Sequence, residues 1–463
     1  MPKIESYEIL VLGSGESGKY LAWTTAKEGR RTALVERDAL GGACPNVACL
    51  PSKNIIYSAK IASLARRATE FGVEMDSVRV NMASVQRRKR AMVDDLHRLH
   101  LDRQAASGAE LIMGEARFVS PRTIEVALKD GGSRQLSGDK VFLAVGSHAA
   151  MPSIAGLAEA HPMTHVEVLD LDRLPGHLIV IGGGYVGLEI AQAIRHFGAQ
   201  VTVIEAGPQL ADHEDPDVGA ALLDLLRSED VEVLLSAEVV VVEGRSGDQV
   251  QVRVKTPDAE HLIRGTDLLV ATGRKANTNG IGLERAGVEL DARGYIKVDE
   301  RLRTSAANVW AMGDCAGSPQ FTHVAFDDFR VVHSHLKGEG RTTRNRLVPF
   351  CMFTDPELAR VGRNELEARR DKLDYRVAKM PMAAVLRTWT VSDRRGFMKI
   401  LVGKQDDEIL GFTVFGFEAS ELISAVQTAM LARLPYTKLG DGIFTHPTVS
   451  EGLIALLSQV ASS

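Results

Sequence analysis

Two stretches of the chain repeat one order of apolar and polar positions. The first begins at residue 7 (YEILVLGSGESGKYLAWTTAKEGRRTALVER) and the second at residue 178 (LIVIGGGYVGLEIAQAIRHFGAQVTVIEA). In each, an apolar run leads into a glycine-rich turn, a helical pattern follows, and a second apolar run comes last. Short apolar runs bounded by turn residues are typical of strands, and apolar positions three or four apart are typical of helices. Both stretches are therefore predicted to fold as strand, turn, helix and strand.

The two turns share the spacing G-x-G-x-x-G and lie 169 residues apart. In this motif the first glycine permits a tight turn, the second lets the backbone approach a pyrophosphate, and the third lets helix and strand pack closely. The pyrophosphate then lies at the positive end of the helix. An acidic residue, Glu36 or Glu205, follows 18 positions after the last glycine and can accept hydrogen bonds from ribose hydroxyls. Two dinucleotide sites are therefore predicted. Their glycines are Gly13, Gly15, Gly18, Gly182, Gly184 and Gly187.

Three further apolar runs also lead into glycine. VFLAVGS (141–147) and DLLVATGR (267–274) end in this way, as strands do where they terminate near a bound ligand, and the second contains Gly273. Another run enters VWAMGDCAG, in which Asp314 follows Gly313.

The character of the chain changes after about residue 340. Alternating runs at 397–403 and 408–416 precede an amphipathic helical pattern, SELISAVQTAMLARL. This segment is predicted to be a separate α+β domain.

The length of the chain indicates how many domains it forms, and its net charge argues against one class of protein. A chain of 463 residues is expected to form two or three domains. Its net charge of -5 argues against a general nucleic-acid binder, and the run at 87–90 (RRKR) is interpreted as a solvated helix face. The sequence shows neither a signal-peptide pattern nor a charge-free apolar stretch of about 18 residues. A cytoplasmic protein without a membrane segment is expected.

Two of the four cysteines, Cys44 and Cys49, lie in the segment GGACPNVACLPSK (41–53). Five residues of straight helix advance the chain by roughly 7.5 Å, whereas a disulfide requires Cα atoms about 4.4 to 6.8 Å apart. Bridging therefore needs a bent or broken turn, for which Pro45 and Pro51 provide irregularity. Two unrelated buried thiols are the alternative. In the cytoplasm, a closely spaced pair is more often catalytic than structural. The remaining cysteines, Cys315 and Cys351, are expected to be core thiols.

The motifs occur in an order that resembles the class I flavoprotein disulfide reductases, which include dihydrolipoamide dehydrogenase, glutathione reductase and mercuric reductase. GSGESG, the C-x4-C segment, GGGYVG, ATGR, MGD and THPTVSEG (445–452) cover essentially the whole chain. The resemblance implies an α/β fold with two Rossmann-like dinucleotide-binding domains and a C-terminal α+β dimerisation domain. The expected boundaries are 1–150 with 275–340 for the FAD domain, 151–274 for the NAD domain and 341–463 for the dimerisation domain.

The resemblance also implies cofactors and residue roles. FAD is expected at the first repeat and NADH at the second, with Asp314 holding the FAD ribityl chain and Lys53 pairing with Glu189. Cys44 follows Glu36, the acidic residue of the first repeat, by only eight residues, which supports this order. Gly273 and Gly313 are further cofactor-binding positions.

Cys49 matches the family's flavin-facing thiolate and Cys44 its interchange thiol, which forms the mixed disulfide with substrate. His446 is expected to reach the dithiol from the other subunit as a base, oriented by Glu451. A homodimer with shared active sites follows from this arrangement.

The choice of nucleotide and substrate rests on a few positions. Glu205 would repel a 2′-phosphate, and residues 206–212 contain no arginine to bind one, so NADH is favoured over NADPH. The expected activity is an NADH-dependent disulfide oxidoreductase of dihydrolipoamide dehydrogenase type. Ala48 and Phe444 depart from that enzyme's pattern, and segments such as QFTHVAFDDFR are similar to a bacterial branch related to mercuric reductase that includes a copper(II) reductase. A reductase of copper(II) or mercuric ions, and a redox sensor with little turnover, remain the alternatives.

Overall fold

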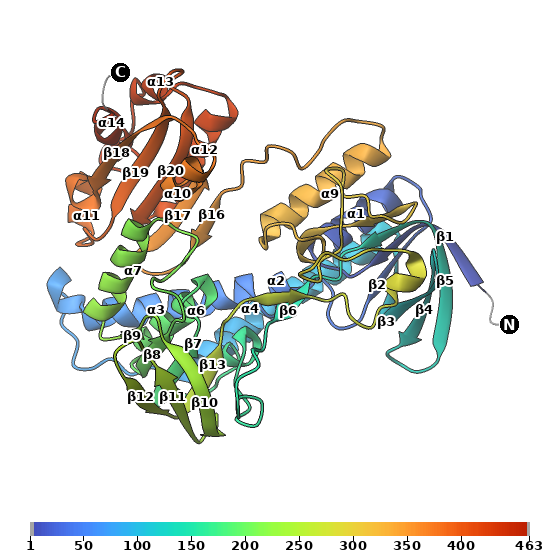
Figure 1. Cartoon of the computed structure of the whole chain (residues 1–463), viewed down its shortest axis with the longest axis horizontal. Coiled ribbons are helices and arrows are strands. Elements are labelled where there is room, and N and C mark those ends of the chain that lie inside the picture. The colour runs from blue at the N-terminus through green and yellow to red at the C-terminus, as the bar shows by residue number, and fades with distance from the viewer. Residues whose placement is uncertain (1–3, 461–463) are drawn as a thin grey trace. The chain divides into compact units, whose positions relative to one another are not determined.

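The structure is a computed structural model that describes residues 4–460, and the chain divides into two compact units (Figure 1). Unit 1 comprises Met1–Asn54, Ala83–Ala150 and Gly273–Arg346. Unit 2 comprises Ile55–Met82, Met151–Thr272 and Leu347–Ser463. Each unit contains one of the two glycine repeats. No helix in the described part of the chain combines the length and the apolarity required to span a bilayer.

Unit 1 is built on a six-stranded sheet. The order is β1-β2-β3-β4-β5-β15, with a further pairing of β1 and β5. β1 pairs in parallel with β2 and β5, and β15 pairs in parallel with β5. The strands are β1 (Ile4–Leu12), β2 (Thr32–Glu36), β3 (Glu110–Ser120), β4 (Thr123–Leu128), β5 (Ser133–Leu143) and β15 (Val309–Ala311). The apolar run before the first glycine turn is thus a strand, as predicted, and the structure places it in the middle of the sheet.

Helices α1 (Glu16–Lys27) and α9 (Thr322–Leu336) pack side by side in unit 1 (Figure 1). Both begin at the glycine-rich end of the unit, since α1 follows Gly15 and α9 follows the turn η2 (Gly313–Ala316). The other elements that lie wholly or partly in this unit are α2 (Ala43–Asn46), α3 (Cys49–Arg66), α4 (Met82–Ser107), β6 (Ser147–Ala149), β14 (Arg274–Ala276) and α8 (Leu283–Ala286).

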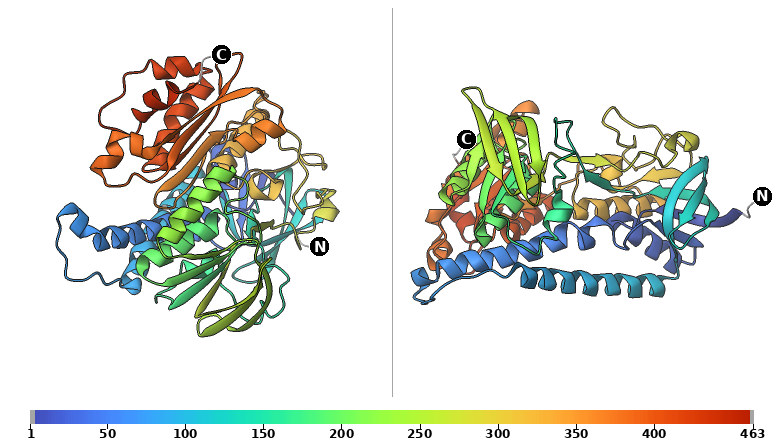
Figure 2. Two further views of the ribbon diagram at one scale, coloured as in Figure 1. Left: turned by 60° about the vertical axis from the view of Figure 1, so that its left-hand side comes forward. Right: turned by 90° about the horizontal axis from the view of Figure 1, so that it is seen from below.

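Unit 2 contains the second repeat in a four-stranded parallel sheet of order β13-β7-β8-β9. Its strands are β7 (His177–Ile181), β8 (Gln200–Ile204), β9 (Glu232–Leu234) and β13 (Asp267–Val270). α6 (Tyr185–Phe197) follows the glycine turn, and α7 (Pro216–Ser228) follows β8. A separate antiparallel sheet of β10 (Glu238–Arg245), β11 (Gln249–Lys255) and β12 (Glu260–Gly265) is visible as yellow-green strands in both views of Figure 2.

The C-terminal part of unit 2 is a five-stranded antiparallel sheet of order β16-β17-β20-β19-β18, with α12 (Ala419–Leu431) packed against β17 and β20. Its strands are β16 (Phe350–Met352), β17 (Glu357–Gly362), β18 (Tyr375–Pro381), β19 (Phe397–Gly403) and β20 (Ile409–Gly416). The remaining helices of unit 2 are η1 (Ala68–Phe71), α5 (His165–Val168), α10 (Glu365–Arg370), η3 (Met382–Ala384), α11 (Leu386–Thr390), α13 (Tyr436–Gly440) and α14 (Gly452–Leu457). The expected α+β character of this segment is confirmed, since the predicted runs at 397–403 and 408–416 are β19 and β20.

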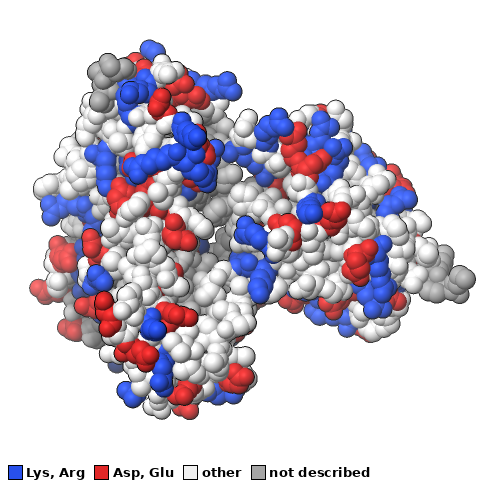
Figure 3. Space-filling view, viewed as in Figure 1, with Lys and Arg blue, Asp and Glu red and all other residues white. Residues whose placement is uncertain are grey.

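Charges of both signs are interspersed over the face drawn in Figure 3. Lys and Arg lie close to Asp and Glu on both units, which agrees with the small net charge of -5.

Candidate functional site

The first glycine turn has two crowded glycines and one open glycine. A Cβ added at Gly13, where φ is +94°, would lie 2.3 Å from the Ala144 carbonyl oxygen, and one at Gly18 would lie 2.0 Å from the Gly13 oxygen. At Gly15 the nearest atom would be 3.7 Å away. Two of the glycines are therefore required by packing, and the middle one leaves its backbone accessible to a ligand.

The Glu36 side chain is bound to this turn by hydrogen bonds from backbone amides. Its carboxylate accepts hydrogen bonds from Ser14 N at 2.9 Å and Asp38 N at 2.8 Å, and also from the Ser14 hydroxyl. The same hydroxyl accepts from Gly41 N at 2.9 Å. A carboxylate has about four acceptor positions, so it can bind a ribose hydroxyl in addition. Ser14 thus links Glu36 to the segment just before the dithiol.

The second glycine turn reproduces this geometry in unit 2. A Cβ at Gly182 would lie 2.5 Å from the Ala271 oxygen, one at Gly187 would lie 2.3 Å from the Gly182 oxygen, and one at Gly184 would meet nothing within 4 Å. Glu205 accepts from Gly183 N and Gly207 N, each at 2.6 Å. Gly183 and Gly207 lie 169 residues after Ser14 and Asp38, so equivalent amides donate to the acidic residue in both turns.

Both turns fit the pyrophosphate of a dinucleotide. Gly15 and Gly184 are the N-caps of α1 and α6, and neither helix has a side-chain cap. The first backbone N–H groups of each helix are therefore not used by a capping side chain, and they lie beside an open glycine. Such helix ends bind phosphate groups.

The dithiol segment contains the predicted break. Cys44 lies in α2, which ends at Asn46, and Cys49 is the first residue of α3. Residues 47 and 48 are not helical. The Asn46 side chain donates to the Gly42 carbonyl at 2.8 Å and thereby holds the short helix against the preceding turn. The expected irregularity between the two cysteines is confirmed.

Cys44 and Cys49 are half-buried thiols that lie together. A hydrogen bond to Cys49 and burial raise the pKa of the Cys44 thiol well above its ordinary value. A nearby thiolate disfavours a second one, so the pair is suited to carry one proton when reduced. Thr322 Oγ1 lies 3.3 Å from the Cys49 sulfur.

This segment abuts the first glycine turn. A Cβ at Gly42, where φ is +72°, would lie 2.6 Å from the Cα of Gly15. The open glycine of the turn and the residue two before Cys44 are thus in direct backbone contact within unit 1. A ligand on this turn would lie next to the two thiols.

The MGD segment provides further polar groups in unit 1. Asp314 accepts a hydrogen bond from the Ser147 hydroxyl and has Arg274 at 3.7 Å. Gly313 N donates to the buried Asp328 at 2.6 Å. Gly273, with φ of +113°, has nothing within 4 Å of a Cβ position. Asp314 and Ser147 are therefore held together, and each has oxygen atoms that can bind hydroxyl groups of a ligand.

His446 and Glu451 form a pair in unit 2. His446 Nδ1 lies 2.8 Å from Glu451 Oε2, and the histidine side chain is 65% exposed. A carboxylate at Nδ1 orients the ring and leaves Nε2 for proton transfer. The Nε2 side is thus available to a neighbouring molecule.

Lys53 and Glu189 belong to different units, and their pairing stays a prediction. Within unit 2, Glu189 accepts a hydrogen bond from Phe353 N at 2.8 Å. Cys315 is buried, which raises the pKa of its thiol to about 12, and this agrees with a core thiol; Cys351 is half-buried in β16.

Three residues of unit 1 that no sequence motif indicates also lie at the site: Thr322, Ser147 and Asp328. Each contacts an expected site residue, namely Cys49, Asp314 and Gly313 respectively. Thr322 and Asp328 lie in QFTHVAFDDFR, whose position just after the MGD segment was the available signal.

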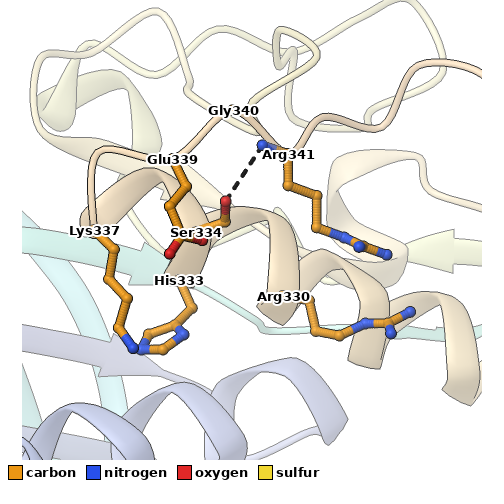
Figure 4. Close-up of a pocket in the computed structure, with 7 residues that line it drawn as sticks. All are labelled: Arg330, His333, Ser334, Lys337, Glu339, Gly340 and Arg341. Atoms are coloured by element: carbon orange, nitrogen blue, oxygen red, sulfur yellow. Dashed lines mark hydrogen bonds between the residues drawn. The ribbon is translucent and has the colours of Figure 1, made fainter.

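A cavity of about 440 Å³ lies on unit 1, lined by α9 and the loop after it (Figure 4). It contains no expected site residue. Arg330 and Arg341 pair with Asp327, whereas His333 and Lys337 pair with Glu28. Each cation around the cavity thus has a carboxylate partner, although Asp327 and Glu28 are each shared by more than one cation. Over residues 4–460, no group of three or more His, Cys, Asp or Glu side chains could hold a metal ion.

Comparison with known proteins places this geometry in a family. The profile of the pyridine nucleotide-disulphide oxidoreductases matches residues 7–328, and the profile of their dimerisation domain matches residues 348–456. The chain is 35% identical to a probable pyridine nucleotide-disulfide oxidoreductase, RclA, of Escherichia coli strain K12, over 99% of this chain and 100% of RclA. It is 34% identical to a mercuric reductase of Acidithiobacillus ferrooxidans, over 97% of this chain and 82% of that enzyme.

A dihydrolipoyl dehydrogenase of Bacillus subtilis strain 168 is 31% identical over 96% of both chains. Among solved structures, the copper(II) complex of the HOCl-induced flavoprotein disulfide reductase RclA from Escherichia coli superposes with a TM-score of 0.89 at 34% identity, covering 99% of this chain and 100% of that chain. The chain therefore belongs to the class I pyridine nucleotide-disulfide oxidoreductases, a family of FAD-dependent enzymes that use a nicotinamide nucleotide and form homodimers through their C-terminal domain.

Proposed function

We propose that this enzyme passes electrons from NADH to the Cys44–Cys49 disulfide and from the resulting dithiol to a disulfide substrate. The observation that carries the proposal is the contact between Gly42 and Gly15, because it puts the two cysteines beside a helix end suited to a dinucleotide. In this proposal FAD binds the first glycine turn and NADH binds the second. The proposed domains are 1–150 with 275–340, 151–274 and 341–463.

Bound FAD would supply two-electron transfer between the nicotinamide and the dithiol. Gly13, Gly15 and Gly18 would receive its pyrophosphate, and Glu36 its ribose. Asp314 and Ser147 would bind hydroxyl groups of its ribityl chain. Gly273 and Gly313 adopt positive φ and let the backbone turn close to a ligand.

The dithiol then does the chemistry on the substrate. Cys44, once deprotonated, attacks one sulfur of the substrate disulfide, breaks the S–S bond and releases the first thiol. Cys49 attacks the Cys44 sulfur of this mixed disulfide, releases the second thiol and restores the Cys44–Cys49 disulfide. A base must take the Cys44 proton and a proton must reach each leaving sulfur.

His446 is proposed as that base, acting on the dithiol of the partner subunit with Glu451 orienting it. The exposure of the histidine in the single chain supports this assignment. Mixing Cys44→Ser and His446→Gln subunits tests it. If the sites are shared, half of the random dimers carry one intact site, so about a quarter of wild-type activity returns. If each site uses its own histidine, activity stays at the level of the parent variants.

NADH is proposed over NADPH because of the position of Glu205. Its carboxylate is held at the second glycine turn by hydrogen bonds from Gly183 N and Gly207 N, where it would repel the 2′-phosphate of NADPH. The measurement is kcat/KM for both nucleotides with Glu205→Gln as the comparison. A ratio that favours NADPH in the wild-type protein would refute the preference.

The central experiment is an anaerobic titration of the FAD-loaded protein with NADH, followed by a count of accessible thiols. Two new thiols per subunit and a thiolate-to-flavin charge-transfer band are expected, and Cys44→Ser should show no gain in thiols. A reduced flavin without new thiols would contradict the proposal. Lipoamide and other small disulfides then serve as acceptors.

A second candidate is reduction of copper(II) ions by the same dithiol. RclA, 35% identical to this chain, has been solved as a copper(II) complex, and so has a variant of RclA in which a cysteine is replaced by serine. Thiolates are soft ligands that favour copper(I). Turnover of NADH with copper(II), lost in Cys44→Ser and faster than with any disulfide, would make this the principal activity. Mercuric ion is the third acceptor to test.

A further inference from the structure

The Thr322 hydroxyl lies beside the dithiol, although Thr322 is 273 residues from Cys49 in the sequence. Its oxygen is 3.3 Å from the Cys49 sulfur, a normal length for a hydrogen bond to sulfur. Thr322, Cys49 and Cys44 all belong to unit 1. A thiolate can only accept a hydrogen bond, and a threonine hydroxyl has one hydrogen to donate. Once Cys49 is ionised, Thr322 is therefore the donor.

The same sulfur lies at two helix N-termini. Cys49 is the first residue of α3, which has 18 residues, and Thr322 is the first residue of α9, which has 15. The N-terminus of a helix carries a partial positive charge, and it stabilises a thiolate placed beside it. The hydroxyl therefore donates to Cys49 where the local field already favours a negative sulfur.

Asp328 holds the start of α9 in place. Its buried carboxylate accepts from Gly313 N at 2.6 Å and from the Ser318 hydroxyl at 2.8 Å, and Arg346 pairs with it at 2.6 Å. Asp328 lies less than two helical turns after Thr322. The first turns of α9 are thus tied to the MGD segment, which fixes the backbone position from which the Thr322 hydroxyl reaches the sulfur.

We infer that Thr322 is a functional residue of the redox site, whose hydroxyl donates a hydrogen bond to the Cys49 sulfur and keeps that sulfur as the thiolate after reduction. This inference rests on the proposed function of the dithiol. Two electrons from NADH break the Cys44–Cys49 bond, one proton goes to Cys44, and Cys49 keeps the negative charge. Thr322 selects which of the two sulfurs carries that charge.

The test measures thiolate formation directly in the FAD-loaded protein. Cys44→Ser leaves Cys49 alone in the peptide 38–53, and Cys49→Ser leaves Cys44 alone there. In each background, the rate of alkylation by iodoacetamide is followed against pH by mass spectrometry of that peptide. Thr322→Val, Thr322→Ala and Thr322→Ser are compared with Thr278→Val, a control that removes the hydroxyl donating to the Gly294 carbonyl of the same unit.

In the Cys44→Ser background, Thr322→Val and Thr322→Ala should raise the midpoint pH of alkylation by about one to two units, the loss expected for a hydrogen bond to a charged group. Thr322→Ser should stay within a few tenths of a unit of the parent. Thr278→Val should not change the midpoint. In the Cys49→Ser background the shift should be smaller, because the hydroxyl is assigned to Cys49.

Equal midpoints for the valine, alanine and serine variants would overturn the inference, as would a larger shift for Cys44 than for Cys49. The alanine variant serves if valine prevents FAD loading. A different result would contradict the proposed function. If NADH generates no thiols in the wild-type protein, the Cys44–Cys49 pair does not accept electrons from NADH, whatever the role of Thr322. If NADH generates two thiols and the midpoints do not differ, only the assignment of Thr322 is wrong.

Discussion

The two glycine turns have the same backbone frame and different surroundings. In both, a carboxylate accepts hydrogen bonds from equivalent amides, and the middle glycine caps a helix without a capping side chain. The difference begins at the residue after the first glycine, which is Ser14 in unit 1 and Gly183 in unit 2. The Ser14 hydroxyl bonds both Glu36 and Gly41 N, whereas Gly183 has no side chain to make such a link.

In the first turn the dithiol segment packs against the middle glycine, since a Cβ at Gly42 would lie 2.6 Å from the Gly15 Cα. A Cβ at Gly15 itself would meet nothing nearer than 3.7 Å, and one at Gly184 would meet nothing within 4 Å. A turn built into its neighbouring segment suits a resident cofactor. An open turn suits a ligand that binds and leaves at every cycle. If FAD and the nicotinamide nucleotide bind as proposed, contacts outside the shared backbone motif distinguish the two sites.

The second turn is supported instead by buried charges from the C-terminal part of unit 2. Tyr185, the first residue of α6, donates to Glu214 at 2.6 Å, and Arg360 pairs with the same carboxylate at 3.0 Å. Lys399, which is 1% exposed, pairs with Asp215 at 2.6 Å and Asp217 at 2.9 Å. Ionic contacts around α6 and α7 thus occur in unit 2 where unit 1 has the packing of Gly42 against Gly15, and both glycine turns are closely packed at their first and third glycines.

The largest effect is expected for Cys44→Ser, a variant that should impair the reaction at the dithiol and leave NADH binding at the second turn intact. Cys44→Ser should lower kcat with disulfide acceptors by about a thousandfold or more, because the attacking thiol is gone. NADH affinity, measured by equilibrium titration, should be unchanged, since the second turn contains no part of the dithiol. A parallel loss of NADH binding would mean that the two turns are not independent.

Lys399→Met should destabilise unit 2 strongly. Removing the cation leaves the buried Asp215 without its partner, a change that costs about 3 to 5 kcal/mol. The expected result is a lower melting temperature of the FAD-loaded protein. Lys438→Met is the control, because its pair with Asp441 is exposed and such pairs contribute little. An equal shift in the control would contradict the role of burial.

The same network predicts an acid dependence. Burial opposes ionisation of Asp217, but hydrogen bonds from Lys379 and Lys399 outweigh it and hold the pKa of this carboxyl below its ordinary value of 3.8. A carboxyl with a lowered folded pKa stabilises the protein above its unfolded pKa, and the contribution disappears as the pH falls through the folded value. The melting temperature should therefore fall below about pH 4, with a weaker fall in Lys399→Met. An unchanged pH profile would count against the network.

Gly42→Ala and Gly184→Ala form a matched pair for the two turns. A methyl group at residue 42 would meet the Gly15 Cα at 2.6 Å and adopt a left-handed φ, which costs about 1 to 2 kcal/mol even before the clash. FAD retention after gel filtration should fall about tenfold. Gly184→Ala has open space, so FAD retention should be normal while NADH binding weakens. Equal FAD loss in both would refute the assignment of the turns.

Ser14→Ala should have the smallest effect. It removes the hydroxyl that joins Glu36 to Gly41 and leaves the backbone frame intact, with an expected cost of about 0.5 to 1.5 kcal/mol in FAD-dependent stability. Thermal unfolding with and without added FAD measures it. No change would show that the link to the dithiol segment is not needed at this turn.

Much of the site could be predicted because it depends on local geometry. The glycine spacing, the acid 18 residues later and the need for a break between Cys44 and Cys49 all follow from short-range constraints, and the structure has the predicted strands, turns and break. Thr322 could not be predicted in this way. It lies 273 residues from Cys49, and a single threonine at a helix start has no pattern that points to sulfur.

The sequence by itself determined the two glycine motifs, the closely spaced cysteine pair and the family, since each is encoded by residue types at short, defined spacings. Only the tertiary structure decided what surrounds them: Gly42 against Gly15, Thr322 against Cys49 and Lys399 between two aspartates. The physical reason is that hydrogen bonds, steric contacts and ion pairs act over a few ångströms. Which distant residues come within that range is a property of the folded chain.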